Sequence, residues 1–199
     1  MDRLRGVGDP VSRATGTPAT HVALLRGINV GGKNLLPMKE LVKLFEKAGA
    51  VDVATYIQSG NVVFSIPAAA FVGFEEEMAA AIEKRFGLRV PVVLRSAQEI
   101  ATVLAKNPFL ARRPDPKTLH VAFLSAKPAA ANAARLDPKR SPGDAFELRG
   151  RDLYLLLPNG VGKTKLTNDY LDRTLATVAT VRNWNTVGKL VEMSARGGS

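Results

Sequence analysis

The chain has 199 residues, of which 46% are hydrophobic and 23% are charged, and it contains no cysteine. These values are ordinary for a globular protein of one domain or two small ones, and they exclude disulfides, a thiol nucleophile and a cysteine zinc site. The formal net charge of +10 favours polyanionic partners such as nucleic acid or nucleotides, with a basic surface lacking a specific partner as the alternative.

The N-terminal residues 1–19 are rich in Gly, Pro and Thr without a period, so we expect a flexible tail. This tail lacks the apolar core of a signal peptide, and the sequence has no apolar run of about 18 residues that would cross a membrane. Together with the absence of cysteine, these features favour a cytoplasmic location. The two histidines, His21 and His120, each open an expected strand, and we expect a structural role for both.

Residues 20–96 predict the β-α-β-β-α-β order of a ferredoxin-like unit. A short apolar strand over 21–26 and a glycine-rich loop lead into a helix over 37–49 that carries one apolar face. The hairpin expected over 51–66 turns at Ser59-Gly60, and a second helix over 71–87 and a strand over 89–95 complete the unit.

Residues 97–117 predict a helix and a proline-rich linker. Ser96 and Glu99 have the spacing of a capping box, which marks the start of this helix. The second unit, over 118–199, is expected to contain a strand, a short helix over 126–137 and a hairpin that turns at Gly150-Arg151. Helices over 162–175 and 182–196 follow. The predicted fold is therefore α+β, with two ferredoxin-like β-α-β-β-α units whose antiparallel sheets are covered by helices.

The segment "LPNGVGKTKL" (157–166) resembles a nucleotide-binding P-loop, but its spacing excludes one. The pattern G-x-x-x-x-G-K-[ST] requires a glycine five positions before Gly162, where the chain has Leu157. The preceding strand also leaves a two-residue hairpin, whereas a P-loop strand belongs to a largely parallel sheet. We therefore predict that the protein is not a P-loop NTPase.

An anion site at the start of the helix over 162–175 remains open. Unpaired backbone N–H groups and the helix dipole favour an anion at such a position. Lys163 and Lys165 would add positive charge, and Thr164 would cap the helix or donate to an oxygen. The alternative is a glycine turn selected only for its backbone geometry.

A second glycine segment, "RGINVGGKN", follows the first strand, and topology predicts that it lies beside "QSGN" in the hairpin. In a two-residue hairpin Gln58 and Asn61 would be directly opposite and on the same face. Polar groups that converge on a glycine loop are typical of small-ligand sites, and backbone N–H groups in such loops can bind anions. The alternative is that the glycines turn the chain and the amides bind the loop backbone. This region ranks first as a candidate site, and its residues are Arg26, Gly27, Asn29, Gly31, Gly32, Lys33, Asn34, Gln58, Ser59 and Asn61.

The C-terminal segment "TVRNWNTVGKL" contains the only tryptophan, Trp184, between amides and a cation. Arg182 and Asn183 are included among the candidate ligand-binding residues, and Trp184 would be able to stack on a base. The favoured interpretation is that Trp184 anchors the last helix to the core.

Four segments together resemble one family of conserved bacterial proteins, domain-of-unknown-function family 1697. They are "ALLRGINVGGKNLLPMKELVKLFEKAG", "TYIQSGNVVF", "LPNGVGKTKLT" and "TVRNWNTVGKL", and the resemblance runs from about His21 to about Met193. It implies a compact α+β protein of two ferredoxin-like halves, and it supplies no reaction, cofactor or catalytic residues.

Three functions remain after these exclusions. The favoured one is a module that binds a phosphorylated or anionic small molecule or nucleic acid at the glycine-rich loops. The typical RNA-recognition motif is disfavoured, because Asn61 and Val63 stand where its stacking rings are expected. An enzyme acting on a small anionic substrate is the second, although no catalytic triad or metal-ligand cluster is visible and we expect no cofactor. The third is a structural or interaction protein, as a monomer or a homodimer.

Overall fold

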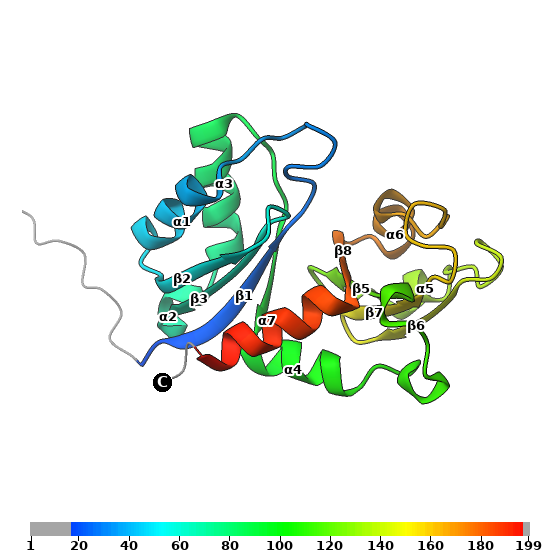
Figure 1. Ribbon diagram of the computed structural model, residues 1–199. Helices are drawn as coiled ribbons and strands as arrows, with labels where there is room; N and C mark the ends of the chain where they lie inside the picture. The colour runs from blue at the N-terminus through cyan, green and yellow to red at the C-terminus, as the bar shows by residue number, and fades with distance from the viewer. Residues whose placement is uncertain (1–16, 197–199) are drawn as a thin grey trace, which may run out of the picture.

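The protein is described here by a computed structural model that covers residues 17–196, so residues 1–16 of the expected tail and 197–199 lie outside the described residues (Figure 1). Two four-stranded antiparallel sheets form two units, which lie on the left and the right of Figure 1. Two helices, α4 and α7, run side by side beneath both units. No helix in the described range is long and apolar enough to cross a membrane.

The first unit is a complete ferredoxin-like unit with the strand order β2-β3-β1-β4. All of its neighbouring strands pair antiparallel. Its elements are β1 (Ala19–Leu25), α1 (Met38–Lys47), β2 (Val51–Tyr56), β3 (Asn61–Ile66), α2 (Ala68–Phe71), α3 (Phe74–Phe86) and β4 (Val92–Ser96). The expected α+β class and ferredoxin-like order are thus confirmed.

The second unit repeats this topology with the strand order β6-β7-β5-β8. The chain reaches it through α4 (Ala97–Ala105) and two 3-10 turns, η1 (Leu110–Arg112) and η2 (Pro116–Thr118). The remaining elements are β5 (Leu119–Leu124), α5 (Ala130–Ala133), β6 (Ala145–Arg149), β7 (Asp152–Leu156), α6 (Asn168–Leu175), β8 (Ala179–Asn183) and α7 (Trp184–Arg196). The predicted capping box at the start of α4 is present, because the Glu99 N–H donates to Ser96 Oγ and the Ser96 N–H donates to Glu99 Oε2.

Four element predictions were wrong in extent or type. The strand β8 was missed, because five residues between a turn and a strongly periodic helix leave little pattern of their own. The helix expected over 71–87 is interrupted at Gly73, whose φ of 76° is left-handed. The helix expected over 126–137 is confined to α5, which begins two residues after Pro128. The helix expected from Gly162 begins only at Asn168, because Thr167 caps it by accepting from the Tyr170 N–H.

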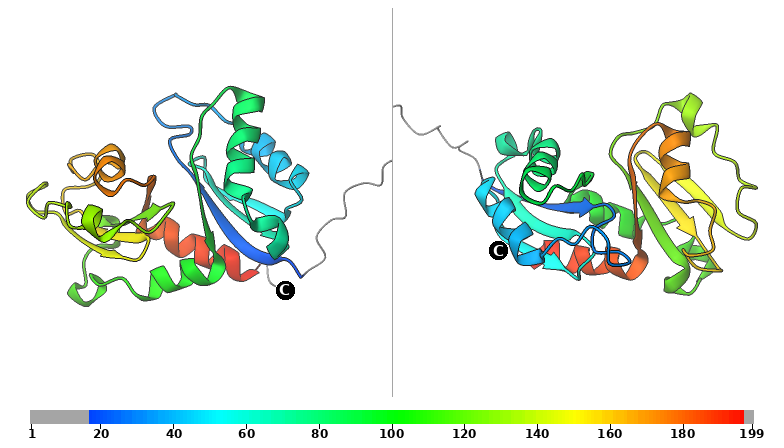
Figure 2. Two further views of the ribbon diagram at one scale, coloured as in Figure 1. Left: turned by 180° about the vertical axis from the view of Figure 1, so that it is seen from behind. Right: turned by 90° about the horizontal axis from the view of Figure 1, so that it is seen from above.

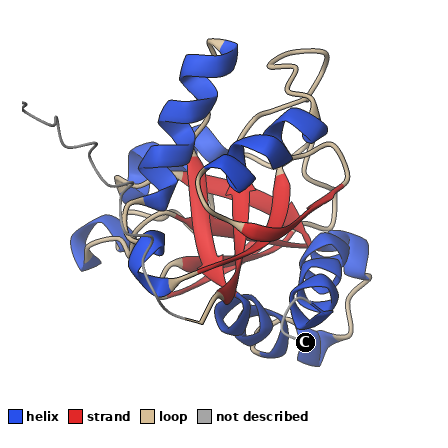
Figure 3. Cartoon of the chain, turned by 90° about the vertical axis from the view of Figure 1, so that its left-hand side faces the viewer, coloured by secondary structure: helices blue, strands red, loops and turns tan. Residues whose placement is uncertain are grey.

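Helices pack on the faces of both sheets (Figures 2 and 3). Three apolar clusters hold these layers together. The outer clusters lie between the first sheet and helices α1 and α3, and between the second sheet and α6. The central cluster joins the inner faces of both sheets to α4 and α7. Alternation along β1 sends Ala23 and Leu25 to an outer cluster and Val22 and Leu24 to the central one, which explains why this strand is apolar on both faces.

Candidate functional site

The first glycine segment is a small β-hairpin that extends from the end of β1 on the side of the molecule where α6 lies (Figure 1). The Asn29 N–H donates to the Asn34 carbonyl at 3.1 Å, and the Lys33 N–H donates to the Val30 carbonyl at 3.0 Å. Gly31 and Gly32 form its tip at φ values of 58° and 73°, as a type I′ turn requires at both central positions. The glycines therefore serve a tight turn, and the space above each is open.

Two asparagines brace this hairpin from within. Asn29 donates from Nδ2 to the Leu36 and Gln58 carbonyls at 3.0 and 2.9 Å, and its Oδ1 accepts from the Leu36 N–H at 2.8 Å. Asn34 donates from Nδ2 to the Gly27 carbonyl at 2.9 Å. These amides bind the loop backbone, which is the structural alternative stated above, and they hold the outer residues of the hairpin in a fixed position.

The neighbouring turn differs from the prediction, although its position is confirmed. Asn61 pairs with Tyr56, so the turn contains the four residues 57–60 and Gln58 is not opposite Asn61. Asn61 closes this longer turn by donating from Nδ2 to the Tyr56 carbonyl and to Ser59 Oγ. The bond from Asn29 to the Gln58 carbonyl shows that the two predicted segments lie side by side.

Arg182 lies in β8, not in a helix as predicted, and it reaches from the second unit into the end of the first sheet. The residue is 8% exposed. Its Nη2 donates to the Leu25 carbonyl at 2.7 Å and to the Ser59 carbonyl at 3.2 Å, and its Nε donates to Asn61 Oδ1 at 2.6 Å. Burial lowers the pKa of Arg182 to about 10, so the guanidinium stays charged at neutral pH although all of these acceptors are neutral.

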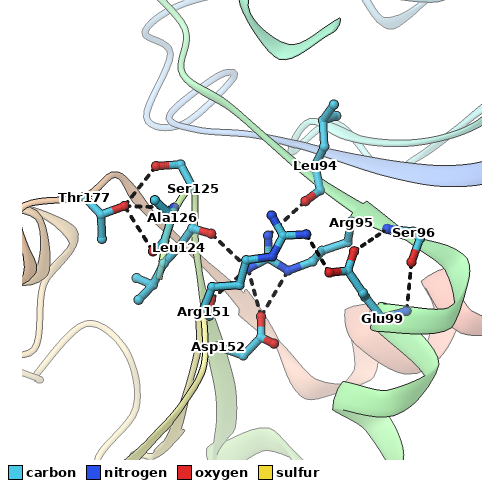
Figure 4. Close-up of polar contacts among 10 residues, drawn as sticks. All are labelled: Leu94, Arg95, Ser96, Glu99, Leu124, Ser125, Ala126, Arg151, Asp152 and Thr177. Carbon is cyan, nitrogen blue, oxygen red and sulfur yellow. Dashed lines mark hydrogen bonds and ion pairs between the residues drawn. The ribbon is translucent and has the colours of Figure 1, made fainter. Parts of the chain in front are cut away.

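Arg95 makes the reciprocal contact from β4 of the first unit into the end of the second sheet (Figure 4). Its Nη2 donates to the Leu124 and Arg151 carbonyls at 2.9 and 2.7 Å, and its Nε donates to Asp152 Oδ1 at 3.1 Å. Leu124 and Asp152 correspond in topology to Leu25 and Asn61. The two ends differ in charge, because a carboxylate accompanies Arg95 and an amide accompanies Arg182.

Sequence reasoning did not identify Arg95, although a signal for it was present. "VVLRSAQ" and "ATVRNWN" are the same pattern in the two units: an apolar strand, an arginine and a capping residue that starts a helix. In the second copy Asn183 is the capping residue, since its Oδ1 accepts from the Asn185 N–H at 2.9 Å. Trp184 is buried in the central cluster with Val187 and Leu190, which confirms that it anchors α7.

Arg26 joins the base of the glycine hairpin to α6. Its Nη2 lies 2.9 Å from Asp169 Oδ1, and its Nη1 contacts Asp172. An acidic partner therefore already neutralises Arg26, and this contact places α6 beside the first glycine loop.

The second glycine segment is a loop before α6 and not the start of the helix. Thr164 Oγ1 accepts from the Leu166 N–H at 3.0 Å, and the Lys165 N–H donates to Ser141 Oγ at 3.1 Å. The prediction that this segment starts a helix is therefore wrong, since the helix begins several residues later. The side chains of Lys163 and Lys165 are exposed.

This loop contributes to a cluster of exposed cations on the second unit, which we name the basic loop pair (residues 134–144 and 157–167). The bond from the Lys165 N–H to Ser141 joins the two loops. The cations are Arg135, Lys139, Arg140, Lys163 and Lys165. In the described part of the chain none of them forms an ion pair, and Arg140 is fixed 4.5 Å from the centre of the Tyr170 ring.

The structure thus gathers the candidate residues into two groups. The end of the first sheet brings together the glycine hairpin, the 57–60 turn, Asn61 and Arg182, and the basic loop pair holds Lys163, Thr164 and Lys165. Within residues 17–196 no three His, Asp or Glu side chains are grouped so that they would hold a metal ion.

The comparisons place this architecture in a family. A family model described as "Protein of unknown function (DUF1697)" matches residues 19–154, and the chain belongs to this family. Among solved structures, the conserved bacterial protein SP0830 from Streptococcus pneumoniae is similar, with a TM-score of 0.64 and 22% identity over 89% of this chain and 99% of that chain. This likeness concerns the fold alone. A comparison with curated proteins finds no match.

Proposed function

We propose that the protein is a binding module for nucleic acid, which it contacts through the phosphate backbone at its two glycine-rich loops. The observation that carries this proposal is the basic loop pair, in which five exposed cations on two joined loops form no ion pair among the described residues. Clustered lysines and arginines on projecting loops suit a polyanion that passes over them, since each phosphate contact releases counterions.

The glycine hairpin adds a second contact on the same side of the molecule. Its lysine, Lys33, is exposed at the tip, and the bonds made by Asn29 and Asn34 hold the tip rigid. A binding element whose conformation is already fixed loses little conformational entropy on binding. Arg26 links this hairpin to Asp169, only four residues after Lys165, so both loops can meet one extended ligand.

A direct test is the fluorescence polarisation of labelled mixed-sequence oligonucleotides in about 50 mM and about 200 mM salt. We expect binding that weakens steeply with salt. The variant Lys163→Ala/Lys165→Ala should bind more weakly with a reduced salt slope, and Lys33→Ala should show a smaller loss.

Lys47→Ala, on the outer surface of α1, is the matched control and should bind as the unchanged protein does. No binding in low salt, or an equal loss in Lys47→Ala, would refute the proposal. A loss confined to Lys33→Ala would move the contact to the first unit.

A further inference from the structure

An open groove of about 470 Å³ lies where the two units meet. Its walls come from β2, α4, η2 and α7, so neither unit forms it alone. Its apolar lining consists of Tyr56, Leu104, Pro116 and Trp184. The groove is shallow, and polar and apolar surface contribute about equally to its lining. Interfaces between units are a common place for small-ligand sites.

The polar groups of the groove carry no net charge. Lys189 and Glu192 both line it, and they form an ion pair with each other at 2.9 Å. Asn185 adds an exposed amide, which offers a hydrogen-bond donor and an acceptor. A neutral groove with the half-buried ring of Tyr56 in one wall and one exposed amide suits an uncharged aromatic heterocycle better than a phosphate.

The groove adjoins the candidate site at the end of the first sheet. Tyr56 pairs with Asn61 and immediately precedes the 57–60 turn, which the glycine hairpin contacts through Asn29. Trp184 follows two residues after Arg182, which binds this same turn. The groove therefore lies beside the turn that the base of the glycine hairpin contacts.

We infer that the groove between Tyr56 and Trp184 binds an unpaired nucleobase, so that the nucleic-acid ligand is single-stranded. The single-stranded ligand in this inference rests on the proposed function, whereas binding of a base in the groove does not depend on it. Bases in single strands are free to stack on aromatic side chains, whereas those in a duplex are already stacked and paired.

The test uses the intact chain and its single tryptophan as the reporter. Trp184 lines the groove, so titration with uncharged nucleosides, adenosine and uridine, should change its fluorescence saturably. We expect Tyr56→Leu to weaken this binding about tenfold, because stacking on an aromatic ring is worth about 1–3 kcal/mol per base. Tyr56→Phe keeps the ring and should bind within about twofold of the unchanged protein.

Lys33→Ala separates the two proposals, because it should weaken oligonucleotide binding and leave nucleoside binding unchanged. Absence of a saturable fluorescence change with millimolar nucleoside would overturn the inference, whatever the oligonucleotides do. Equal affinity of Tyr56→Leu and Tyr56→Phe would overturn it as well. Nucleoside binding without any oligonucleotide binding would support the groove and refute only the proposed function.

Discussion

The two reciprocal arginines predict different pH dependence when each is replaced by methionine. Methionine keeps an unbranched stem as far as the position of Nε and removes the guanidinium with its charge and donors. In Arg95→Met, Asp152 loses its nearest cation, and removing one partner of a buried ion pair costs about 3–5 kcal/mol. In Arg182→Met only neutral oxygens lose their donor, for which we expect a loss on the order of 3 kcal/mol.

The difference arises from the titration of Asp152. Burial raises the pKa of Asp152, and Arg95 opposes this shift, so its removal raises the pKa further. The folded Arg95→Met protein then holds a proton that the unfolded chain releases. Its free energy of unfolding should therefore decrease as the pH rises from about 4 through the raised pKa, by up to about 1.4 kcal/mol per pH unit.

Urea denaturation of both variants and the unchanged protein at pH 5, 6.5 and 8 measures this effect. The destabilisation of Arg95→Met should be smallest at pH 5, and that of Arg182→Met should not vary. Arg95→Met/Asp152→Asn is the control and should lose the pH dependence. Parallel pH profiles for Arg95→Met and Arg182→Met would refute the assignment of a charged partner to Arg95 alone.

Three further predictions concern the backbone, a histidine and a helix cap. Gly60→Ala should destabilise the protein by about 2–5 kcal/mol, because the φ of Gly60 is 75° and the new Cβ would lie 2.7 Å from Leu25 Cβ. Gly31→Ala has open space around the new Cβ and should cost only about 1–2 kcal/mol. Thermal or urea unfolding measures both losses. Burial lowers the pKa of His21 despite the opposing charge of Glu99, so the protein should lose stability as the pH falls from about 6.5 through the lowered pKa. Melting temperatures at pH 7.5 and 5.5 measure this loss, and the drop at pH 5.5 should be smaller in His21→Phe. An equal drop in both proteins would contradict this cause. Ser96→Ala removes the α4 cap and should cost about 1 kcal/mol by urea denaturation, and a neutral effect would show that Glu99 alone caps the helix.

Regular periodicity and turn chemistry allowed the sequence to predict most of the fold. The helix at Pro37 and the capping box at Ser96 depend on neighbouring residues, so their signals are local. The strand β8 depends instead on its pairing with β5. A short segment that is stabilised mainly by distant contacts leaves little local pattern.

The candidate site was predicted in position and only partly in detail. Topology alone placed the glycine hairpin beside the 57–60 turn, and the bond from Asn29 to the Gln58 carbonyl confirms it. The partners of Arg26 and Arg182 were not predictable, because they lie more than 100 positions away in the chain and depend on how the two units pack. The length of the turn was missed because Ile57 adopts a φ of 51°, a conformation that a β-branched residue rarely takes.

The arginine that each unit contributes to the other also affects how the protein unfolds. Leu25 and Leu124 present carbonyls at the ends of the central strands, and each carbonyl receives its arginine donor from the opposite unit. If one unit unfolded alone, the other would lose its donor and would expose its half of the central apolar cluster. We therefore expect the two units to unfold together in a single cooperative transition, with the segment between α4 and β5 acting as a fixed connection and not as a hinge.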